Sequence, residues 1–350
     1  MVNIEINEQK IAVQEGTTIL QAAKELNIHI PHLCYIKKLK PTSACRLCVV
    51  EVTGARNLVA SCSYPVSEGM KVQTDSERVL KARRMIIDLL LSDHPTDCLT
   101  CEKNGKCKLQ NYAFQLGVPA SRFTGEKHTY PVDKSNPFFE RDYNKCILCG
   151  RCVSACQDVQ ISEAIDYINR GFKSKIGVPY DRGLQDSTCV FCGQCVNVCP
   201  VGALTEKSVK NKVREWELKK VKTTCPYCGC GCSLELNIKD NKIVKVTGND
   251  DGASNKGNLC IKGKFGWEFV HSKDRLTTPL IRKDGSLTPT TWEEALTYTA
   301  DKFKELKAKY GGDSLCTLSS ARCTNEDNYI MQKFTRAVMQ TNNIDHCARL

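Results

Sequence analysis

The chain has 350 residues, 23 cysteines and a formal net charge of +11; its length exceeds what one hydrophobic core usually covers and predicts several domains. It begins without a secretory signal or twin arginine, and its longest apolar stretch, around Met85 to Leu91, contains Asp88 and is too short to span a bilayer, so we expect a cytoplasmic protein without membrane insertion. Cytoplasmic thiols stay reduced, which disfavours a disulfide framework and favours metal ligands.

The first 77 residues predict a small α+β domain with four cysteines on its loops. Residues 2–6 and 10–13 alternate like short strands, and a helical pattern runs from Thr18 to Leu26. Around a further strand-like run at 47–52 stand Cys34, Cys45, Cys48 and Cys62. Four thiolates held by loops suit a 2Fe-2S cluster; the alternative is four unrelated buried cysteines. The spacing resembles the 2Fe-2S domain of the large iron–sulfur subunit of respiratory complex I and of iron-only hydrogenases.

A second set of candidate ligands follows a helix predicted over 77–91. His94 precedes Cys98, Cys101 and Cys107. A histidine just after a helix is more often a capping or surface residue, but the three cysteines favour a ligand, because imidazole binds iron. The same two families carry this spacing, and the resemblance implies a 4Fe-4S cluster with one histidine ligand in the segment 78–118.

An internal repeat begins after residues 119–137, which read as a linker. Two runs at an offset of 43 residues match the two-cluster bacterial ferredoxin pattern: Cys146, Cys149, Cys152 and Cys156, then Cys189, Cys192, Cys195 and Cys199 with Pro200. In that pattern the fourth cysteine of each run binds the other cluster. We therefore expect Cys199 to join the first run and Cys156 the second, within a domain over 137–210. Gln157 stands where the pattern has proline, and zinc is the competing ligand.

Residues 206–222 read as a charged connecting helix, and a further four-cysteine set follows it. Cys225, Cys228, Cys232 and Cys260 enclose a hairpin predicted around Asp240-Asn241. Four cysteines alone would also allow zinc. The segments TTCPYCGCGCSL and GNLCIKGKFGWEFVHSKDRLTTPLIR resemble the 4Fe-4S domain of molybdopterin oxidoreductases, specifically molybdenum or tungsten formate dehydrogenases. The resemblance implies a domain over 218–277, excludes Cys230 as a ligand, and places Lys262 between this cluster and the pterin.

From Thr291 the pattern changes to α/β, with a helix from TWEEAL to AKY, a strand near 315–318, a loop SSARCTNEDNY and a helix MQKFTRAVM. This resembles the start of the formate dehydrogenase pterin-binding domain, here 278–350. Ser320, Arg322 and Asn325 are the implied candidate contacts of bis-molybdopterin guanine dinucleotide; the alternative for Arg322 is a structural salt bridge. The final TNNIDHCARL matches the segment that leads to the metal-ligating selenocysteine or cysteine. We expect that ligand immediately after Leu350, with a UGA codon read as a stop, so that this chain alone would not oxidise formate; Cys347 is not at the ligand position. The alternative to the UGA codon is a deliberately chosen end of the chain.

Together these patterns predict an α+β multidomain protein with one 2Fe-2S and four 4Fe-4S clusters. Such clusters would lower the net charge to about +2, which removes the case for a nucleic-acid partner. The resemblance implies an electron relay of a formate dehydrogenase or CO2 reductase catalytic subunit, working with a redox partner subunit that is an NAD(P)-linked flavoprotein, a ferredoxin or a hydrogenase. The alternative is a non-catalytic iron–sulfur subunit of a hydrogenase or NADH dehydrogenase-like complex.

Overall fold

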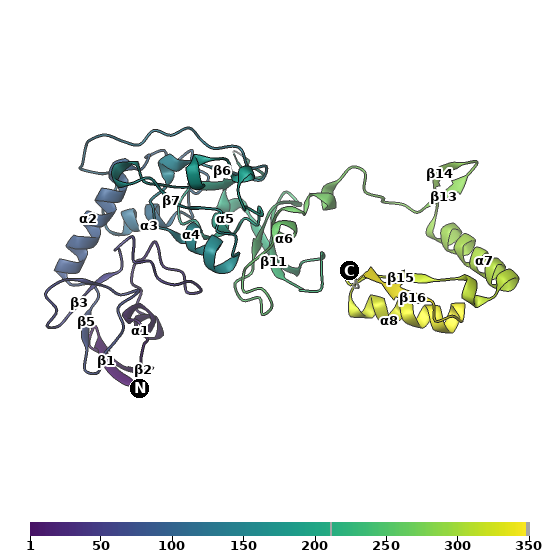
Figure 1. The fold of residues 1–350 in the computed structure, drawn as a ribbon, viewed down its shortest axis with the longest axis horizontal. Coiled ribbons are helices and arrows are strands. Elements are labelled where there is room, and N and C mark those ends of the chain that lie inside the picture. Colours follow the sequence, from purple (N-terminus) through teal and green to yellow (C-terminus); the bar gives the residue numbers. More distant parts are fainter. Residues whose placement is uncertain (211, 348–350) are drawn as a thin grey trace.

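The computed structural model describes residues 1–210 and 212–347, and these form α+β modules that follow one another in chain order. Figure 1 shows the N-terminal module at one end, the central modules beside it, and the C-terminal unit at the other end of a long connecting segment. The α+β multidomain class predicted from the sequence is confirmed. None of the helices among the described residues has the length and apolar character needed to cross a membrane.

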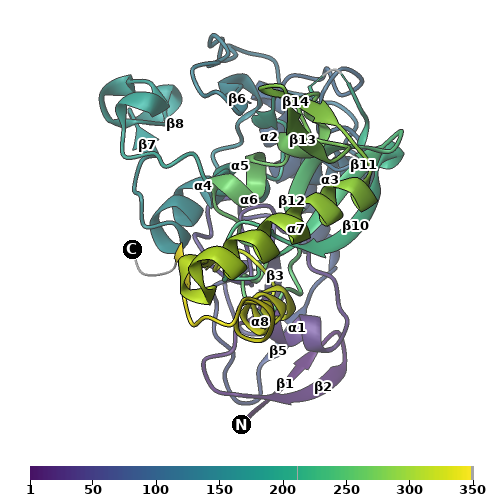
Figure 2. The ribbon, with the colours of Figure 1, turned by 90° about the vertical axis from the view of Figure 1, so that its right-hand side faces the viewer.

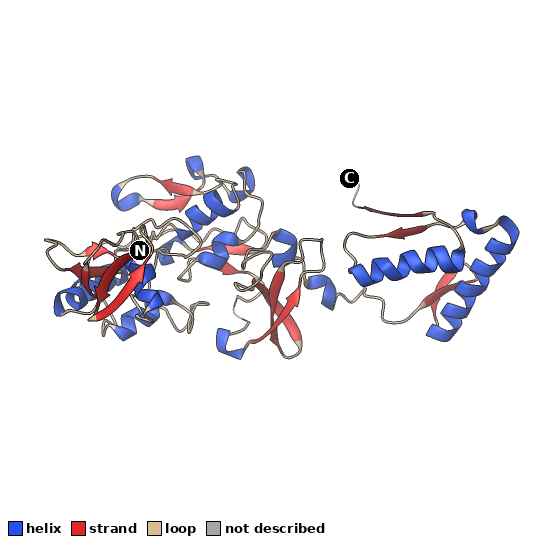
Figure 3. Ribbon diagram, turned by 90° about the horizontal axis from the view of Figure 1, so that it is seen from below, coloured by secondary structure: helices blue, strands red, loops and turns tan. Residues whose placement is uncertain are grey.

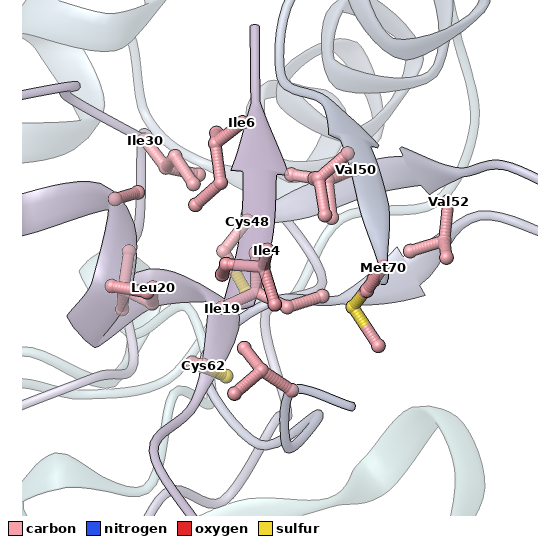
Figure 4. Packing of buried hydrophobic residues seen from close by; sticks show 14 of the residues in the cluster. Ile4, Ile6, Ile19, Leu20, Ile30, Cys48, Val50, Val52, Cys62 and Met70 are labelled. Atoms are coloured by element: carbon pink, nitrogen blue, oxygen red, sulfur yellow. The ribbon is translucent and has the colours of Figure 1, made fainter. Parts of the chain in front are cut away.

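The N-terminal module is a five-stranded sheet in the order β2-β1-β5-β3-β4, with one helix packed against it. Its elements are β1 (Val2–Ile6), β2 (Gln9–Val13), α1 (Ile19–Glu25), β3 (Val49–Val52), β4 (Val59–Ala60) and β5 (Lys71–Gln73). β1 pairs antiparallel with β2 and parallel with β5. Thr18 and Gln21 form a capping box that begins α1. Figure 4 shows side chains of the sheet, of α1 and of two cysteines meeting in one core.

Two helices and an irregular segment cover the next part of the chain. α2 (Glu77–Asp93) is capped by Ser76, and α3 (Lys108–Gln115) packs beside it in a core that includes Ile87, Leu91 and Leu109. Arg83 is buried in α2 and donates from Nη2 to the carbonyl oxygen of Val49 at 2.8 Å, which ties the helix to the first sheet. The linker segment that follows is fastened to α2 by hydrogen bonds from Arg122 to the carboxylate of Asp88.

The double-repeat module, residues 137–210, is built from two short helical turns and two small sheets. β6 (Phe139–Arg141) pairs antiparallel with β9 (Leu204–Glu206), so the module's two ends meet. α4 (Arg151–Ser154) continues as a π-helical turn, Ala155–Val159, and α5 (Gln194–Val198) is its counterpart in the second repeat. Between them lies the hairpin of β7 (Asp166–Ile168) and β8 (Lys175–Gly177). Short 3₁₀ helices occupy Tyr143–Lys145, Gly171–Lys173, Pro179–Asp181 and Leu184–Asp186.

The helix predicted over 206–222 is wrong. The described residues of this segment form turns, a 3₁₀ helix at Glu215–Glu217 and the strand β10 (Lys219–Thr224). β10 pairs antiparallel with β11 (Ser233–Lys239), which pairs with β12 (Lys242–Gly248) in a three-stranded sheet. Pairing with a strand formed later in the chain outweighs a weak local helix preference. Asp240 and Asn241 both have positive φ, 49° and 57°, which confirms the predicted hairpin turn.

The C-terminal unit follows α6 (Ile261–Phe265) and a 3₁₀ helix at Glu268–His271. It consists of the hairpin β13 (Leu280–Lys283) and β14 (Ser286–Pro289), α7 (Trp292–Tyr310), a 3₁₀ helix at Gly312–Ser314, β15 (Thr317–Ser319), α8 (Asn325–Phe334), a π-helical turn at Thr335–Met339 and β16 (Ile344–His346). β15 and β16 are parallel, and Figure 3 shows α8 beside them. Figure 2 shows α7 and α8 together in the foreground. The expected ligand position beyond Leu350 borders residues 348–350, which lie outside the described residues.

The helix α8 begins earlier than its sequence pattern suggested. Residues 325–329 were expected in a loop, but they form its first turns. The reason is a capping box, because the side chain of Thr324 accepts from the N–H of Asp327 while the carboxylate of Asp327 accepts from the N–H of Thr324.

Candidate metal centres

The first group of thiols lies within the N-terminal module. Its four cysteines are each less than a tenth exposed and lie on loops around β3 and β4: Cys34, Cys45, Cys48 and Cys62. The backbone N–H groups of Leu33 and Cys34 both donate to Sγ of Cys45 at 3.4 Å. Oγ of Ser43 lies 3.5 Å from Sγ of Cys62. The structure thus brings the four candidate ligands together in a shielded site with donors aimed at sulfur.

These thiols hydrogen-bond to one another, which shifts their pKa values in opposite directions. A bond from Cys45 and another from Cys62 lower the pKa of Cys34, and a bond from Cys62 lowers that of Cys48. The bond to Cys34 and burial raise the pKa of Cys45 and Cys62. Four thiolates so close together repel one another, so all four are charged at once only with a cationic core between them. A 2Fe-2S core, about +2, fits this donor set.

The second group surrounds the C-terminal end of α2. His94 ends that helix, its Nδ1 is buried, and this atom has no hydrogen-bond partner among the described residues. Burial lowers the pKa of His94, with the nearby Lys145 acting in the same direction, so the ring is held neutral, the form that binds a metal. Cys107 is buried, and Cys98 and Cys101 are half-buried. A buried imidazole nitrogen without a partner, next to three thiols, fits a cluster with one histidine ligand.

The two cysteine runs of the double-repeat module line two neighbouring cavities. One cavity is lined by Cys146, Cys149, Cys152 and Cys199, and Cys195 lines both this cavity and the second. The other is lined by Cys156, Cys189, Cys192 and Cys195. In each cavity the fourth cysteine comes from the other run, which is the arrangement expected of two-cluster ferredoxins.

The repeat also extends to the backbone. Leu148 and Phe191 occupy equivalent positions and have positive φ of 51° and 53°, and Gly150 and Gly193 have 73° and 74°. Such values are uncommon for large side chains, and here they recur at equivalent positions of the two repeats. Burial raises the pKa of Cys146 to about 11, against the opposing hydrogen bond of the Leu148 backbone. The N–H of Phe191 acts in the same way on Cys189.

The last group is the most exposed. Cys225 is buried, its N–H donates to the carbonyl oxygen of Cys232 at 2.8 Å, and Cys260 caps the start of α6. Cys228 and Cys260 are exposed. Cys230, which the family resemblance excluded as a ligand, is also exposed and hydrogen-bonds to Cys228, whose pKa is lowered by the backbone N–H of Cys230 and by that thiol.

The four candidate pterin contacts do not all lie together. Lys262 lies in the first turn of α6, and its charge and that of Arg322 both reach Cys228. Ser320 accepts a hydrogen bond from the N–H of Arg322 at 3.1 Å, in the loop after β15. Asn325 is instead the first residue of α8. The structure therefore groups Lys262 and Arg322 beside the last thiol group and places Asn325 in a helix.

Cations between the groups were missed by the sequence reading. Nζ of Lys103 donates to the carbonyl oxygen of Cys199 at 2.9 Å, and Nη1 of Arg151 donates to that of Leu33 at 3.4 Å. Burial lowers the pKa of both. Lys145 forms ion pairs with Asp97 and Asp142 at 3.2 and 3.5 Å. A lysine or arginine close to a cysteine in the sequence was the available signal, but spacing does not show which such cation points inward.

The two thiol groups of the double-repeat module surround cavities. Among the described residues, no three histidine, cysteine, aspartate or glutamate side chains are arranged to hold one metal ion. A 2Fe-2S or 4Fe-4S core is several atoms wide, so its ligands do not need to converge in that way.

Five family models match successive parts of the chain. They are a 2Fe-2S iron–sulfur cluster binding domain (residues 1–77), the iron–sulfur binding region of NADH-ubiquinone oxidoreductase-G (83–122), the ferredoxin-like domain of NADH-quinone oxidoreductase subunit 3 (136–205), the molybdopterin oxidoreductase Fe4S4 domain (218–272) and molybdopterin oxidoreductase (275–350).

Relatives cover the same modules. The NADPH-Fe(3+) oxidoreductase subunit alpha of Geobacter sulfurreducens is 38% identical over the whole chain, and the "Putative formate dehydrogenase YrhE" of Bacillus subtilis is 37% identical over 99% of it. A chain in the crystal structure of an NAD+-reducing [NiFe]-hydrogenase has a TM-score of 0.57 and 34% identity, over 61% of this chain and 90% of that one. The chain combines iron–sulfur domains of the NADH-quinone oxidoreductase type with domains of the molybdopterin oxidoreductases. It spans 40% of the length of these two curated relatives.

Proposed function

We propose that this chain is the electron-relay portion of a formate dehydrogenase or CO2 reductase catalytic subunit. The observation that carries the proposal is that its five thiol groups lie in four successive modules, two of them in the double-repeat module, and that hydrogen bonds beside candidate ligands join these modules. Iron–sulfur domain models along residues 1–272 support this reading.

The proposed ligands are the sequence-predicted residues. One 2Fe-2S cluster is held by Cys34, Cys45, Cys48 and Cys62, and four 4Fe-4S clusters are held by His94 with Cys98, Cys101 and Cys107; by Cys146, Cys149, Cys152 and Cys199; by Cys189, Cys192, Cys195 and Cys156; and by Cys225, Cys228, Cys232 and Cys260. When bound, these clusters supply sites that each take and give one electron. The protein's part is to hold them in series and keep water from the buried ones.

The contacts between modules support a spatial order for the proposed series. Arg151 links the first ferredoxin-type run to Leu33, beside Cys34. Lys103 links the histidine-containing group to Cys199. At the opposite side, Gln194 donates to the carbonyl oxygen of Leu259 at 3.1 Å, beside Cys260. The cavity lined by Cys146 therefore faces the N-terminal groups, and the cavity lined by Cys192 faces the C-terminal group.

The two ends of this series define the proposed partners. At the C-terminal end, Lys262, Ser320 and Arg322, with Asn325 at the start of α8, would contact a bis-molybdopterin guanine dinucleotide carrying molybdenum or tungsten, where formate and CO2 interconvert in the longer protein. At the N-terminal end we propose a redox partner subunit, an NAD(P)-linked flavoprotein, a ferredoxin or a hydrogenase. The nicotinamide cofactors in the names of the Geobacter and hydrogenase relatives support the first. The reduced thiols that this function requires support a cytoplasmic location.

A second function has its own support. The similarity to the hydrogenase chain over 61% of this protein favours a non-catalytic iron–sulfur subunit of a hydrogenase or NADH dehydrogenase-like complex. The two functions differ in one measurable property, since only the first requires molybdopterin and molybdenum or tungsten in the protein purified with its natural partners. Metal analysis that finds neither metal in the active complex would exclude the formate dehydrogenase function.

The relay itself is tested by iron and sulfide content and by EPR of the reduced chain, purified and reconstituted without oxygen. We expect about 18 irons per chain from one 2Fe-2S and four 4Fe-4S sites. Cys260→Ser should remove the C-terminal cluster, about four irons, whereas the control Cys230→Ser, an exposed cysteine between two proposed ligands, should remove none. About 14 irons with bound zinc in the unmodified chain would make one four-cysteine group structural and break the relay.

A further inference from the structure

A buried lysine joins the double-repeat module to the three-stranded sheet. Lys264, on α6, has no exposed surface. Its Nζ donates to Oε1 of Glu206 at 2.6 Å and to the carbonyl oxygen of Val246 at 2.7 Å. Glu206 ends β9 of the double-repeat module, and Val246 belongs to β12. A buried charge without a partner is costly, so each of these two modules needs the other for this contact.

The surroundings of Lys264 form one continuous joint. Phe265 stacks on Phe138 with ring centroids 4.5 Å apart and planes 9° apart. A Cβ added to Gly193 would lie 2.9 Å from Cζ of Phe265 and 3.1 Å from Cγ of Lys264. Gln194, itself buried, donates to Leu259 across the same boundary. The ion pair of Lys264, the ring stacking of Phe265 and the hydrogen bond of Gln194 therefore hold α6 and Leu259 against the double-repeat module.

This joint connects two of the candidate metal centres. Gly193 and Gln194 lie between Cys192 and Cys195, while Leu259 directly precedes Cys260, the residue that caps α6. We infer that Lys264 is a positioning residue for electron transfer: its ion pair with Glu206 holds the cavity lined by Cys192 beside the thiol group that contains Cys260. This inference rests on the relay proposed above, and it concerns the spacing of two sites, whereas Lys262 concerns the pterin.

A stabilising role alone is a poor explanation for such a pair. Buried ion pairs add little net stability compared with well-packed apolar residues, because desolvation offsets the attraction, and in some proteins their role is to select one arrangement of the fold. Electron transfer between two modules depends on that arrangement. The surface pair of Lys283 and Glu294 has a similar N–O distance of 2.7 Å but is about half exposed on both sides, which makes it a matched control.

The test compares Lys264→Met and Glu206→Gln with Lys283→Met in the full chain, reconstituted without oxygen. Iron content reports loading, EPR of the fully reduced chain reports magnetic interaction between neighbouring clusters, and hydrogen–deuterium exchange reports opening of residues 259–266. We expect all three variants to keep about 18 irons. In Lys264→Met and Glu206→Gln, the EPR signal of the C-terminal cluster should lose the broadening caused by its neighbour. The backbone amides of residues 259–266 should exchange at least about tenfold faster. Lys283→Met should change neither.

The outcomes separate this inference from the relay. Unchanged broadening and exchange in both joint variants would overturn it. An unmodified chain that lacks the C-terminal cluster would overturn the relay and, with it, the electron-transfer role of Lys264. Unchanged hydrogen–deuterium exchange of residues 259–266 in the two joint variants would refute the joint, whatever the cluster content. Glu206→Gln keeps the shape of the glutamate, so it decides the question if Lys264→Met does not fold.

Discussion

At the scale of the residue, the candidate ligands can be identified from their spacing in the sequence, whereas the buried cations around them cannot. Cysteine and histidine spacing is local, and it points directly to the chemistry of a soft metal site. The cations that lie between the groups, Lys103 and Arg151 among them, have no such spacing. Their buried charge is opposite in sign to that of all-cysteine clusters, so we expect them to favour reduction of the neighbouring centres.

His94 offers the sharpest test at this scale. Replacing a neutral imidazole by a thiolate adds negative charge to the cluster and disfavours its reduction. For His94→Cys we therefore expect unchanged iron content and a reduction potential lower by on the order of 100 mV, measured by an EPR-monitored redox titration. His271→Cys, which alters a histidine that accepts from the N–H of Ile243, should leave every potential in place. A full iron content with an unshifted potential in His94→Cys would show that His94 is not a ligand.

At the scale of the element, the two repeats have the same backbone but different neighbours. Gly150 and Gly193 share a left-handed conformation, but a Cβ at Gly150 would meet Oη of Tyr167 at 2.5 Å, whereas at Gly193 it would meet α6. One repeat thus packs against its own insertion and the other against the next module. The sequence repeat is symmetric, and its packing is not.

Gly193→Ala should therefore lower the free energy of unfolding by more than the cost of placing an alanine in the left-handed conformation. A left-handed alanine costs about 1 to 2 kcal/mol, and that is the loss expected for Gly171→Ala, where φ is 58° and no atom lies within 4 Å of the added Cβ. Gly193→Ala adds a clash with Phe265. Urea unfolding of the two variants side by side measures the difference, and equal losses would mean that α6 does not pack on this glycine.

At the scale of the whole molecule, charged side chains hold modules together where apolar contact is sparse. Glu215 accepts from Lys106 and from Lys245, both at 2.6 Å, and so ties the histidine-containing segment to β12. Burial opposes ionisation of Glu215, but the two lysines outweigh it and lower the pKa to about 2. Figure 1 shows these modules side by side, with the C-terminal unit apart from them.

Glu215→Gln should weaken that connection at neutral pH by about 1.5 to 3 kcal/mol, the value of hydrogen bonds to a charged group. Because the folded pKa lies below the unfolded value of 4.5, the carboxylate contributes its full stability above about pH 4.5 and loses it as the pH falls towards 2. The difference in free energy of unfolding between the unmodified protein and the variant should shrink over this range. A difference that does not change with pH would contradict the ion pair.

The C-terminal unit should be dispensable for cluster loading. All proposed ligands precede α6, and neither α7 nor α8 contains a buried residue. A chain ending at Arg275 should keep about 18 irons and the EPR signals of the full chain. Loss of about four irons would show that the unit protects the exposed group of Cys228 and Cys260.

The sequence by itself determined the elements and ligand groups whose signals are local. The helix start at Thr18, the turn at Asp240-Asn241 and the cysteine runs each lie within a few residues, so their chemistry is readable without a fold. The signal for the start of α8 is equally local, because Thr324 and Asp327 form a capping box within four residues.

Only the tertiary structure decided how the modules meet. It made a strand of Lys219–Thr224, because pairing with β11 supplies hydrogen bonds that a surface helix preference cannot match. It also selected which lysines are buried, placing Lys264 against Glu206, 58 positions away in the chain. Burial and ion pairing depend on surfaces brought together from distant segments, and for that reason residue spacing identifies the metal sites but not the contacts that place them in series.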